Sequence, residues 1–320
     1  MLELLKSYQA KAAQLDSEDP LKKYRSYFSL PKDPKSIYLC NNSLGLPASA
    51  ALSKISEQFQ NWVEFGAEGW FKDKSNWYNS YDVPLNKPLS NLLGAKYHEV
   101  IVMNSLTVNL HLSHAAGNIS LHLHDWGIDF AVGCSYKYLC SGPGGPGIAF
   151  VHESHHDKDL PRFSGWWGND PKTRFKMQLQ GEFLPFGGAY SWQVSTPSIL
   201  SMIPLMASFE VFEEVGFANF RKKSELQTAS LLELLESVSS TYLKPPFEVI
   251  TPKNPDQRGC QLSLLIYNDC KQCLEKLEHN GVICDFRPPN VIRVTPSPFY
   301  NTYHDIYEFV CHLSKSLISM

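Results

Sequence analysis

The sequence predicts an α/β chain that ends in a small α+β domain, and three observations support this. Its 320 residues, 43% of them hydrophobic, are enough for a sizeable core and for two domains. Short apolar runs typical of buried strands alternate with segments whose apolar residues recur at helical spacing. Beyond residue 240 the expected order becomes β-β-α-β-β-α, which is typical of a compact α+β domain. We therefore expect a larger domain over 1–240 and a small domain over 241–320.

Strands and helices alternate along the larger expected domain. Its strands are predicted at 36–40, 99–105, 129–133 and 147–152. Its helices are predicted at 1–27, 48–66, 106–112, 197–215 and 219–239. In the tail, strands are predicted at 247–252, 259–267, 281–287 and 291–296, and helices at 269–281 and 303–317. The stretch STYLKPP, just after the last helix of the larger domain, marks the expected boundary.

Composition and charge exclude several classes of function. A net charge of -3 gives no electrostatic case for binding nucleic acid or an anionic membrane. The eight cysteines lie mostly in apolar runs, so buried reduced thiols are expected. Cys270 and Cys273 form a C-x-x-C, but no second ligand pair follows, which disfavours a metal or redox site. The N-terminus has no apolar signal core, and no apolar run approaches the roughly 20 residues that span a bilayer. We expect a soluble, cytoplasmic chain.

One lysine stands out in the stretch CSYKYLCSGPGG, which covers 134–145. The apolar run DFAVG precedes it, so Lys137 is expected at the mouth of a buried strand. A lysine desolvated beside aromatic and hydroxyl groups has a lowered pKa, and its free amine can form a Schiff base with an aldehyde. The alternative is a lysine at a strand end with its head in water. This stretch alone leaves both interpretations open.

A candidate anion site lies upstream of this lysine. Ser105 and Thr107, in NSLTVNLH, fall at an expected turn from strand to helix, where free backbone N–H groups and the helix dipole attract an anion. The glycines after Lys137 allow close approach of the backbone. A phosphate site together with an imine-forming lysine is what pyridoxal 5'-phosphate (PLP) requires.

Several motifs, in order and nearly end to end, resemble the kynureninase family. They are YLCNNSLGLP, VMNSLTVNLHL, HAAGN, LHDWGIDFAVGCSYKYL, GWWG, TPSIL and NVIRVTPSPFYNTYHDIYEF. The resemblance implies a homodimeric PLP enzyme of the aspartate-aminotransferase fold (fold type I). It also implies hydrolysis of kynurenine or 3-hydroxykynurenine to alanine and an anthranilate, in tryptophan catabolism and de novo NAD biosynthesis. Cysteine desulfurases, a more remote alternative, share the fold and a lysine followed by glycines but lack GWWG and the pair NNSLGLP and NSLTVNLH.

The resemblance assigns a role to each matching position. Lys137 matches the catalytic Schiff-base lysine, and Arg293 matches the arginine that binds the substrate α-carboxylate. The other cofactor-binding positions are Leu106, Thr107, His114, Tyr136, Trp166 and Thr196. The other substrate-facing positions are Asn42, Ser43 and Trp70. Taken singly, each of these has a structural alternative, such as a helix cap at Thr196 or plain packing at Trp70.

The sequence departs from the family between NLHL and SHAAGN, which here join directly. In the family a long stretch of the large domain lies between them, with several parallel strands, the aromatic residue that stacks on the cofactor, and the aspartate that pairs with its ring nitrogen. The position three before His114 is His111, not aspartate. We therefore expect a shortened large domain, with weak or absent catalysis. The alternative is an inactive isoform that keeps only the dimer surface.

A metal cluster is not expected. His111, His122, His124, His155 and His156 are spaced in a way that implies different faces, and PLP chemistry needs no metal.

Overall fold

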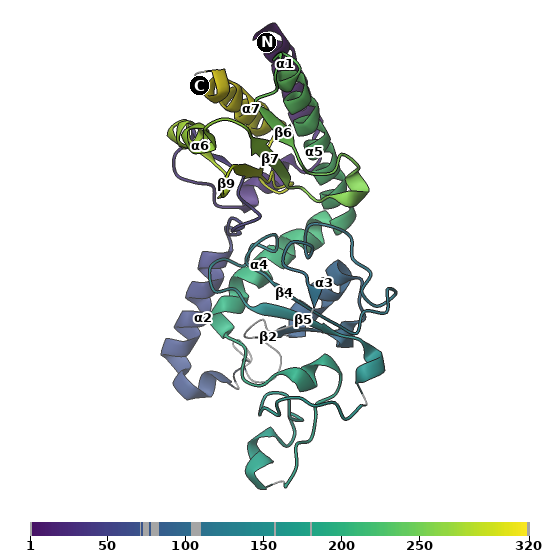
Figure 1. Cartoon of the computed structure of the whole chain (residues 1–320). Coiled ribbons are helices and arrows are strands. Elements are labelled where there is room, and N and C mark those ends of the chain that lie inside the picture. Colours follow the sequence, from purple (N-terminus) through teal and green to yellow (C-terminus); the bar gives the residue numbers. More distant parts are fainter. Residues whose placement is uncertain are drawn as a thin grey trace. The chain divides into compact units, whose positions relative to one another are not determined.

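The computed structural model describes residues 2–70, 72, 77, 83–103, 110–156, 158–179 and 181–318. It divides into two compact units (Figure 1). Met1–Leu46 and Val215–Met320 form unit 1, and Pro47–Glu214 forms unit 2. Among the described residues, no helix is both long and apolar enough to span a membrane.

The sheet of unit 1 is antiparallel and four-stranded. Its order is β6-β7-β10-β9, with β6 at Phe247–Val249, β7 at Leu262–Ile266, β10 at Val291–Val294 and β9 at Asp285–Arg287. A second, parallel pair joins β1 (Ile37–Tyr38) to β8 (Val282–Ile283). Buried and half-buried residues alternate along β7, as expected for a sheet with one face on a core.

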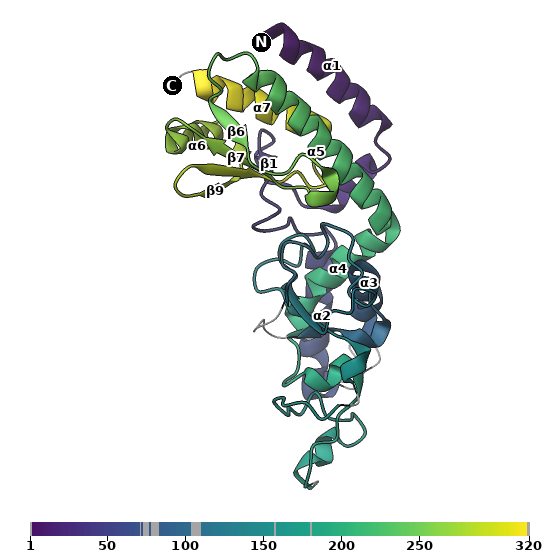
Figure 2. The same cartoon turned by 45° about the vertical axis from the view of Figure 1, so that its right-hand side comes forward.

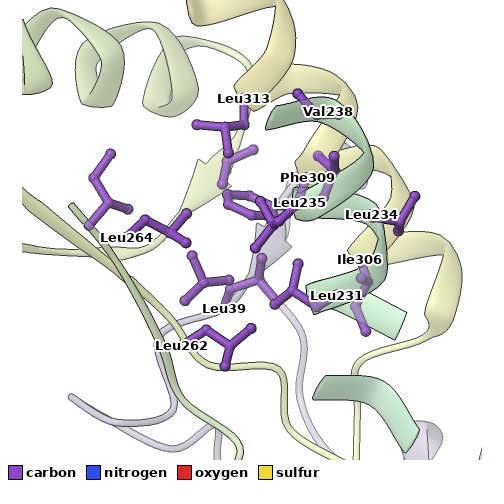
Figure 3. Close-up of a cluster of buried hydrophobic side chains, with 14 of the residues drawn as sticks. Leu39, Leu231, Leu234, Leu235, Val238, Leu262, Leu264, Ile306, Phe309 and Leu313 are labelled. Atoms are coloured by element: carbon purple, nitrogen blue, oxygen red, sulfur yellow. The ribbon is translucent and has the colours of Figure 1, made fainter. Parts of the chain in front are cut away.

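Four α-helices complete unit 1 and cover its core. They are α1 (Leu2–Glu18), α5 (Phe217–Ser239), α6 (Cys270–His279) and α7 (Tyr303–Ile318). Helix α7 packs against the other three (Figure 2). Leu231 and Leu235 of α5 meet Leu264 of β7 and Phe309 of α7 in the core (Figure 3), and all four are at most 1% exposed. Burial of such apolar side chains is the main favourable term in folding this unit.

The N-terminal helix is fixed to the rest of unit 1 by two aspartates that follow one another closely. Asp16 accepts hydrogen bonds from the backbone N–H groups of Tyr303 and His304, at 2.6 and 3.0 Å, so it satisfies free donors at the start of α7. Asp19 lies 2.6 Å from the Lys223 ammonium on α5, and the two side chains are 4% and 6% exposed. Burial lowers the pKa of Lys223, and its pairing with Asp19 opposes that shift.

The division between the units differs from the boundary expected at residue 240. Helix α5 contributes Leu231 and Leu235 to the core that contains the C-terminal strands, so it belongs with them rather than with the larger domain. The first 46 residues also join this unit, because α1 packs on α7 and β1 pairs with β8. The stretch STYLKPP is a loop within one unit and not a domain linker.

Unit 2 contains a four-stranded mixed sheet with the order β2-β5-β4-β3. The strands are β2 (Val100–Met103), β3 (Leu110–His111), β4 (Phe130–Cys134) and β5 (Gly147–Val151). Strand β5 is antiparallel to both of its neighbours, whereas β3 is parallel to β4 and forms the edge. In the described part of this unit the sheet is accompanied by the α-helices α2 (Ala51–Phe65), α3 (Val83–Leu93) and α4 (Ile199–Val215).

Short 3₁₀ segments fill much of the remaining chain. They lie at Lys22–Tyr27, Gly66–Trp70, Tyr97–Glu99, Glu153–His155, Arg174–Leu179, Gly188–Trp192 and Pro255–Gln257. The helix expected over 106–112 is wrong at its end, because Leu110–His111 pair with β4 as a strand; residues 104–109 lie outside the described residues. Helix α3 was not predicted, since Pro88 and Asn86 obscure its helical spacing.

The buried pair between Asp19, which follows α1, and Lys223 of α5 leads to a stability prediction. Replacing Asp19 with Ala leaves the Lys223 charge buried without its partner, which should lower the free energy of unfolding by about 3–5 kcal/mol. Urea denaturation followed by circular dichroism measures this loss. The matched control is Lys11→Ala, which removes an ion pair with Glu233 whose side chains are both 48% exposed and should cost less than about 1 kcal/mol. Equal losses in the two variants would contradict the prediction.

Candidate functional site

Lys137 follows strand β4 directly, at the mouth of the strand where the sequence predicted it. Its Nζ donates a hydrogen bond to the Tyr136 hydroxyl at 2.8 Å and lies 3.3 Å from the Cys134 sulfur. The ammonium is also 4.2 Å from the centre of the Tyr136 ring. The side chain is half-buried, so the amine combines a fixed phenol partner with access from solvent.

The loop that carries Lys137 is pinned by two buried serines. The Ser135 hydroxyl donates to the Pro146 carbonyl at 2.6 Å and shares a 2.6 Å hydrogen bond with the Ser141 hydroxyl. Gly145 is required for this closure, because a Cβ at that position would lie 1.9 Å from Ser141 Oγ. The hydrogen bonds tie the end of β4 to the start of β5, and Lys137 is held in the connection between them.

A second segment reaches the same end of the sheet from β3. The backbone N–H of Leu112 donates to the Val132 carbonyl at 2.7 Å, and the Cys134 N–H donates to the Ser113 hydroxyl at 3.0 Å. The next residue, His114, is exposed, and its ring makes an edge contact with Tyr138, 6.1 Å between centroids. His114 therefore lies beside the loop of Lys137.

The structure describes the other predicted cofactor positions only in part. Leu106 and Thr107 lie outside the described residues, as does the side chain of Trp70. Trp166 packs with Trp167, 5.3 Å between ring centroids. The guanidinium of the buried Arg174 lies over both rings, at 5.9 and 4.1 Å. Thr196 is half-buried in the segment before α4.

Arg293 and Asn42, predicted separately as substrate-facing residues, contact each other in unit 1. With the Asn42 amide oriented to satisfy its neighbours, its oxygen accepts from Arg293 Nη2 at 3.1 Å and its nitrogen donates to Thr295 Oγ1 at 3.0 Å. Arg293 Nε also bonds the carboxylate of Asp285, directly opposite on β9. In the described part of the chain no hydrogen bond reaches Arg293 Nη1. The outer edge of the Arg293 guanidinium, which carries Nη1, is thus the edge left for a bidentate carboxylate.

Asp285 was missed by the sequence reasoning, although its position in the structure is clear. It bonds Arg293 and also lies 3.2 Å from Arg287 Nε, so two guanidinium groups share one carboxylate and the cluster keeps one net positive charge. The signal in the sequence was the short turn at 288–290, which pairs Arg287 with Val291 and hence places Asp285 opposite Arg293. A single net positive charge suits a ligand with one carboxylate.

The thiol of Cys40 borders this cluster. Burial raises the pKa of Cys40, and the Asp285 carboxylate raises it further, while Arg293 and a hydrogen bond with Ser43 oppose the shift. The exposed Ser43, also predicted to face the substrate, follows Asn42 in the same turn, and its N–H donates to the Cys40 carbonyl at 3.0 Å. Cys40 is therefore a reporter of the charges around Arg293.

The predicted site residues consequently form two groups, one in each unit. The residues predicted to face the substrate (Asn42, Ser43 and Arg293), called the carboxylate-binding group after the role expected of Arg293, belong to unit 1. The lysine group (His114, Tyr136 and Lys137) belongs to unit 2, as do Trp166 and Thr196.

The pKa of Cys40 provides a test of the carboxylate-binding group. Asp285→Asn removes a negative charge that raises the pKa of Cys40, so the pH at which Cys40 becomes reactive should fall; Arg293→Gln should raise it. The measurement is the rate of iodoacetamide alkylation against pH, with peptides resolved by mass spectrometry. The matched control is Lys11→Ala, which removes a charge that is not among the causes of the Cys40 shift and should leave the Cys40 profile unchanged. If the pH dependence of Cys40 alkylation is the same in the Asp285→Asn and Arg293→Gln variants as in the wild type, this arrangement is refuted.

Comparison with known proteins identifies the family. The model of the kynureninase C-terminal domain matches residues 220–313. The kynureninase of Flavobacterium johnsoniae is 34% identical, over 96% of this chain and 97% of its own length. Those of Koribacter versatilis and Monosiga brevicollis are 32% and 31% identical, over 93% and 96% of this chain and 95% of their own lengths.

Solved structures with a similar fold are more distant in sequence. The apo cysteine desulfurase of Thermococcus onnurineus has a TM-score of 0.72 at 11% identity, over 93% of this chain and 98% of its own. A C-DES variant with glycine covalently linked to its PLP cofactor has a TM-score of 0.69 at 13% identity, over 91% and 98%. These likenesses concern the fold alone, and they confirm the predicted fold type I.

The alignment with the Flavobacterium johnsoniae protein also confirms an internal gap. It runs over 418 positions, more than the 320 residues of this chain, although it reaches nearly both ends of each protein. Part of that relative therefore has no counterpart here, as the direct junction of NLHL with SHAAGN predicted. With this identity over nearly its whole length, the chain belongs to the kynureninase family.

Proposed function

We propose that this chain is a PLP-dependent hydrolase with kynureninase activity. It would convert L-kynurenine or 3-hydroxykynurenine, with water, to anthranilate or 3-hydroxyanthranilate and L-alanine. The proposal rests on the position of Lys137 in a chain of the kynureninase family. This lysine follows β4, and its amine donates a hydrogen bond to the Tyr136 hydroxyl. We further propose that it acts as a homodimer in the cytoplasm.

The described residues fit PLP where it would be attached. Lys137 presents an accessible amine, and the hydroxyl of Tyr136 and the ring of His114 lie in or beside its loop. The fit is poorer for the ring nitrogen, because His111 stands where the family has an aspartate. When bound, PLP supplies the electron sink that lets bonds at the substrate α-carbon break. A histidine holds a proton on the ring nitrogen less firmly than a carboxylate does, which weakens that sink.

The residues of the chain divide the remaining work. Arg293 would bind the substrate α-carboxylate through its outer edge, while Asp285 and Asn42 hold its inner edge and fix its orientation. Lys137 would remove the α-proton, because its amine is the base at the end of β4, and the Tyr136 hydroxyl would hold that amine in place. Water then adds to the γ-carbonyl carbon, the Cβ–Cγ bond breaks to release the anthranilate, Cβ takes up a proton, and Lys137 would return a proton to the α-carbon to give alanine.

The second candidate function is that of an impaired or inactive isoform. The feature that favours it is the short edge strand of the unit 2 sheet, where the family has further strands and this chain, by its sequence, has none. The junction of NLHL with SHAAGN falls at β3, a two-residue strand at that edge. The parallel strands that the family inserts at this point would continue the sheet there. Without them the chain lacks the aromatic residue and the aspartate that hold the cofactor ring, although Lys137 and Arg293 are kept. We therefore propose low activity rather than the full activity of the longer relatives.

The attachment of the cofactor is tested by chemical trapping. Incubation with PLP followed by borohydride should leave a stable pyridoxyl group on Lys137, because its half-buried amine is held at the end of β4. Peptide mapping by mass spectrometry identifies the labelled residue. Lys137→Arg keeps the positive charge and should lose this label. A label on another lysine, with Lys137 unmodified, would rule out the assignment.

Turnover is tested by release of anthranilate from kynurenine. We expect a rate about 100-fold below that of a chain into which the missing stretch of a curated relative is inserted, the size of loss seen when one preorganised electrostatic group is removed. Fluorescence of anthranilate and chromatography of alanine measure the reaction, and Lys137→Arg gives the background. Equal rates for the two chains would show that the stretch is dispensable. No turnover by the extended chain would refute the proposed activity.

A further inference from the structure

A cluster of metal-binding side chains lies in unit 2, at the end of the sheet away from Lys137. Strands β2 and β4 run in the same direction and β5 runs opposite, so Glu99 before β2 and His152 after β5 share one end. Lys137, after β4, lies at the other end. His124 joins the first two from the loop before β4. One oxygen of Glu99 and one nitrogen of each histidine all lie within 4.8 Å of one another.

Glu99 is the fixed member of the cluster. Its side chain is fully buried, and its carboxylate accepts hydrogen bonds from the backbone N–H groups of Lys96 at 2.8 Å and Glu153 at 3.0 Å. Burial alone would raise the pKa of Glu99, but these bonds and the contact with His124 outweigh it and lower the pKa. The carboxylate is thus held ionised and in one orientation before any ligand arrives, as a metal site requires.

The two histidines lie close to Glu99 and to each other. Nδ1 of His124 lies 2.7 Å from Glu99 Oε1, and the rings of His124 and His152 are parallel within 8°, with centroids 4.9 Å apart. Nδ1 of His152 accepts a hydrogen bond from the Ser154 backbone N–H at 3.2 Å and lies 2.9 Å from the Ser154 hydroxyl, so binding a metal through Nε2 requires Nδ1 to give up the first bond and donate to the hydroxyl instead. A hydrogen bond on one ring nitrogen that orients the other is the usual arrangement of metal-binding histidines.

We propose that Glu99, His124 and His152 bind one divalent transition metal ion, with Zn²⁺ as the best match. Two imidazoles and a carboxylate are a known protein ligand set for zinc, and water completes the tetrahedron. Bond lengths of about 2.0–2.2 Å require the ligand atoms to approach to roughly 3–3.5 Å. The half-buried histidines would move to do this, while Glu99 stays in place. The hydrogen bond between His124 and Glu99 would then be replaced by two bonds to the metal.

The position of the cluster indicates a structural role for the ion. It would join three segments: the start of β2, the loop before β4 and the end of β5. Glu153, which pairs with Lys96 at 2.5 Å and lies 3.5 Å from His98, forms the charged rim of the site. Because the cluster is remote from Lys137, the expected effect is on stability rather than on catalysis. The inference therefore stands or falls independently of the proposed kynureninase activity.

The experiment uses the untagged full-length chain, stripped with EDTA and desalted. Titration calorimetry with ZnCl₂ should give one site per chain with micromolar or tighter affinity, and elemental analysis after desalting should find one zinc per chain. Zinc should raise the melting temperature, since it binds only the folded chain. Co²⁺ in place of zinc should give a visible absorption band, which reports the coordination directly.

Variants decide whether the named residues are the ligands. His152→Ala, at a half-buried position, and Glu99→Gln should each weaken zinc binding at least tenfold and abolish both the thermal shift and the Co²⁺ band. The matched control is His122→Ala, which removes an exposed histidine of the same loop, in edge contact with Trp126, and should leave all three readouts unchanged. Circular dichroism checks that each variant is folded.

Three results would overturn the proposal. They are the absence of saturable zinc binding, equal binding by wild type and His152→Ala, and an equal loss in His122→Ala, which would indicate unspecific binding by surface histidines. In each case Glu99 and His124 form only a hydrogen-bonded pair at this end of the sheet.

Discussion

Strand β5 is the constraint on which the arrangement of unit 2 depends. All five of its residues are buried, and it pairs antiparallel with β2 on one side and β4 on the other. The loop that enters β5 carries Lys137, and the segment that leaves it begins with His152. One strand thus fixes both the lysine group and the candidate metal cluster, at opposite ends of the same sheet. Serines 135 and 141 tighten the first of these ends.

Much of the fold could be predicted from the sequence, because continuous apolar runs and turns are local signals. The run DFAVG predicted β4 and placed Lys137 at its mouth, as observed. The helix expected over 106–112 was wrong at Leu110–His111. A short apolar segment fits the periodicity of a helix and that of a strand, and here the pairing with β4 makes it a strand. The same limit explains the domain boundary, since nothing local shows that α1 packs on α7.

Residues of the candidate site that belong to a sequence motif could be proposed from the sequence. Residues that only position another side chain could not, because their place depends on strand pairing. Lys137, Arg293 and Asn42 follow from motifs, and the structure adds their partners. Asp285 has no motif of its own and matters because antiparallel pairing sets it opposite Arg293. The cluster of Glu99, His124 and His152 was also hidden, since its members are separated by 25 and 28 residues along the chain and meet only through the sheet.

The clamp between α1 and α7 has a consequence for the synthesis of the chain. Asp16 caps a helix that begins at Tyr303, and β1 pairs with β8, so unit 1 needs residues from both ends of the polypeptide. A ribosome releases α1 long before α7 exists, and residues 47–214 must emerge in between. Unit 2, which is continuous, can complete its contacts first, whereas unit 1 closes only after α7 has been made. Until then the apolar face of α1 is without its partner, and that interval is when the nascent chain most needs protection from aggregation.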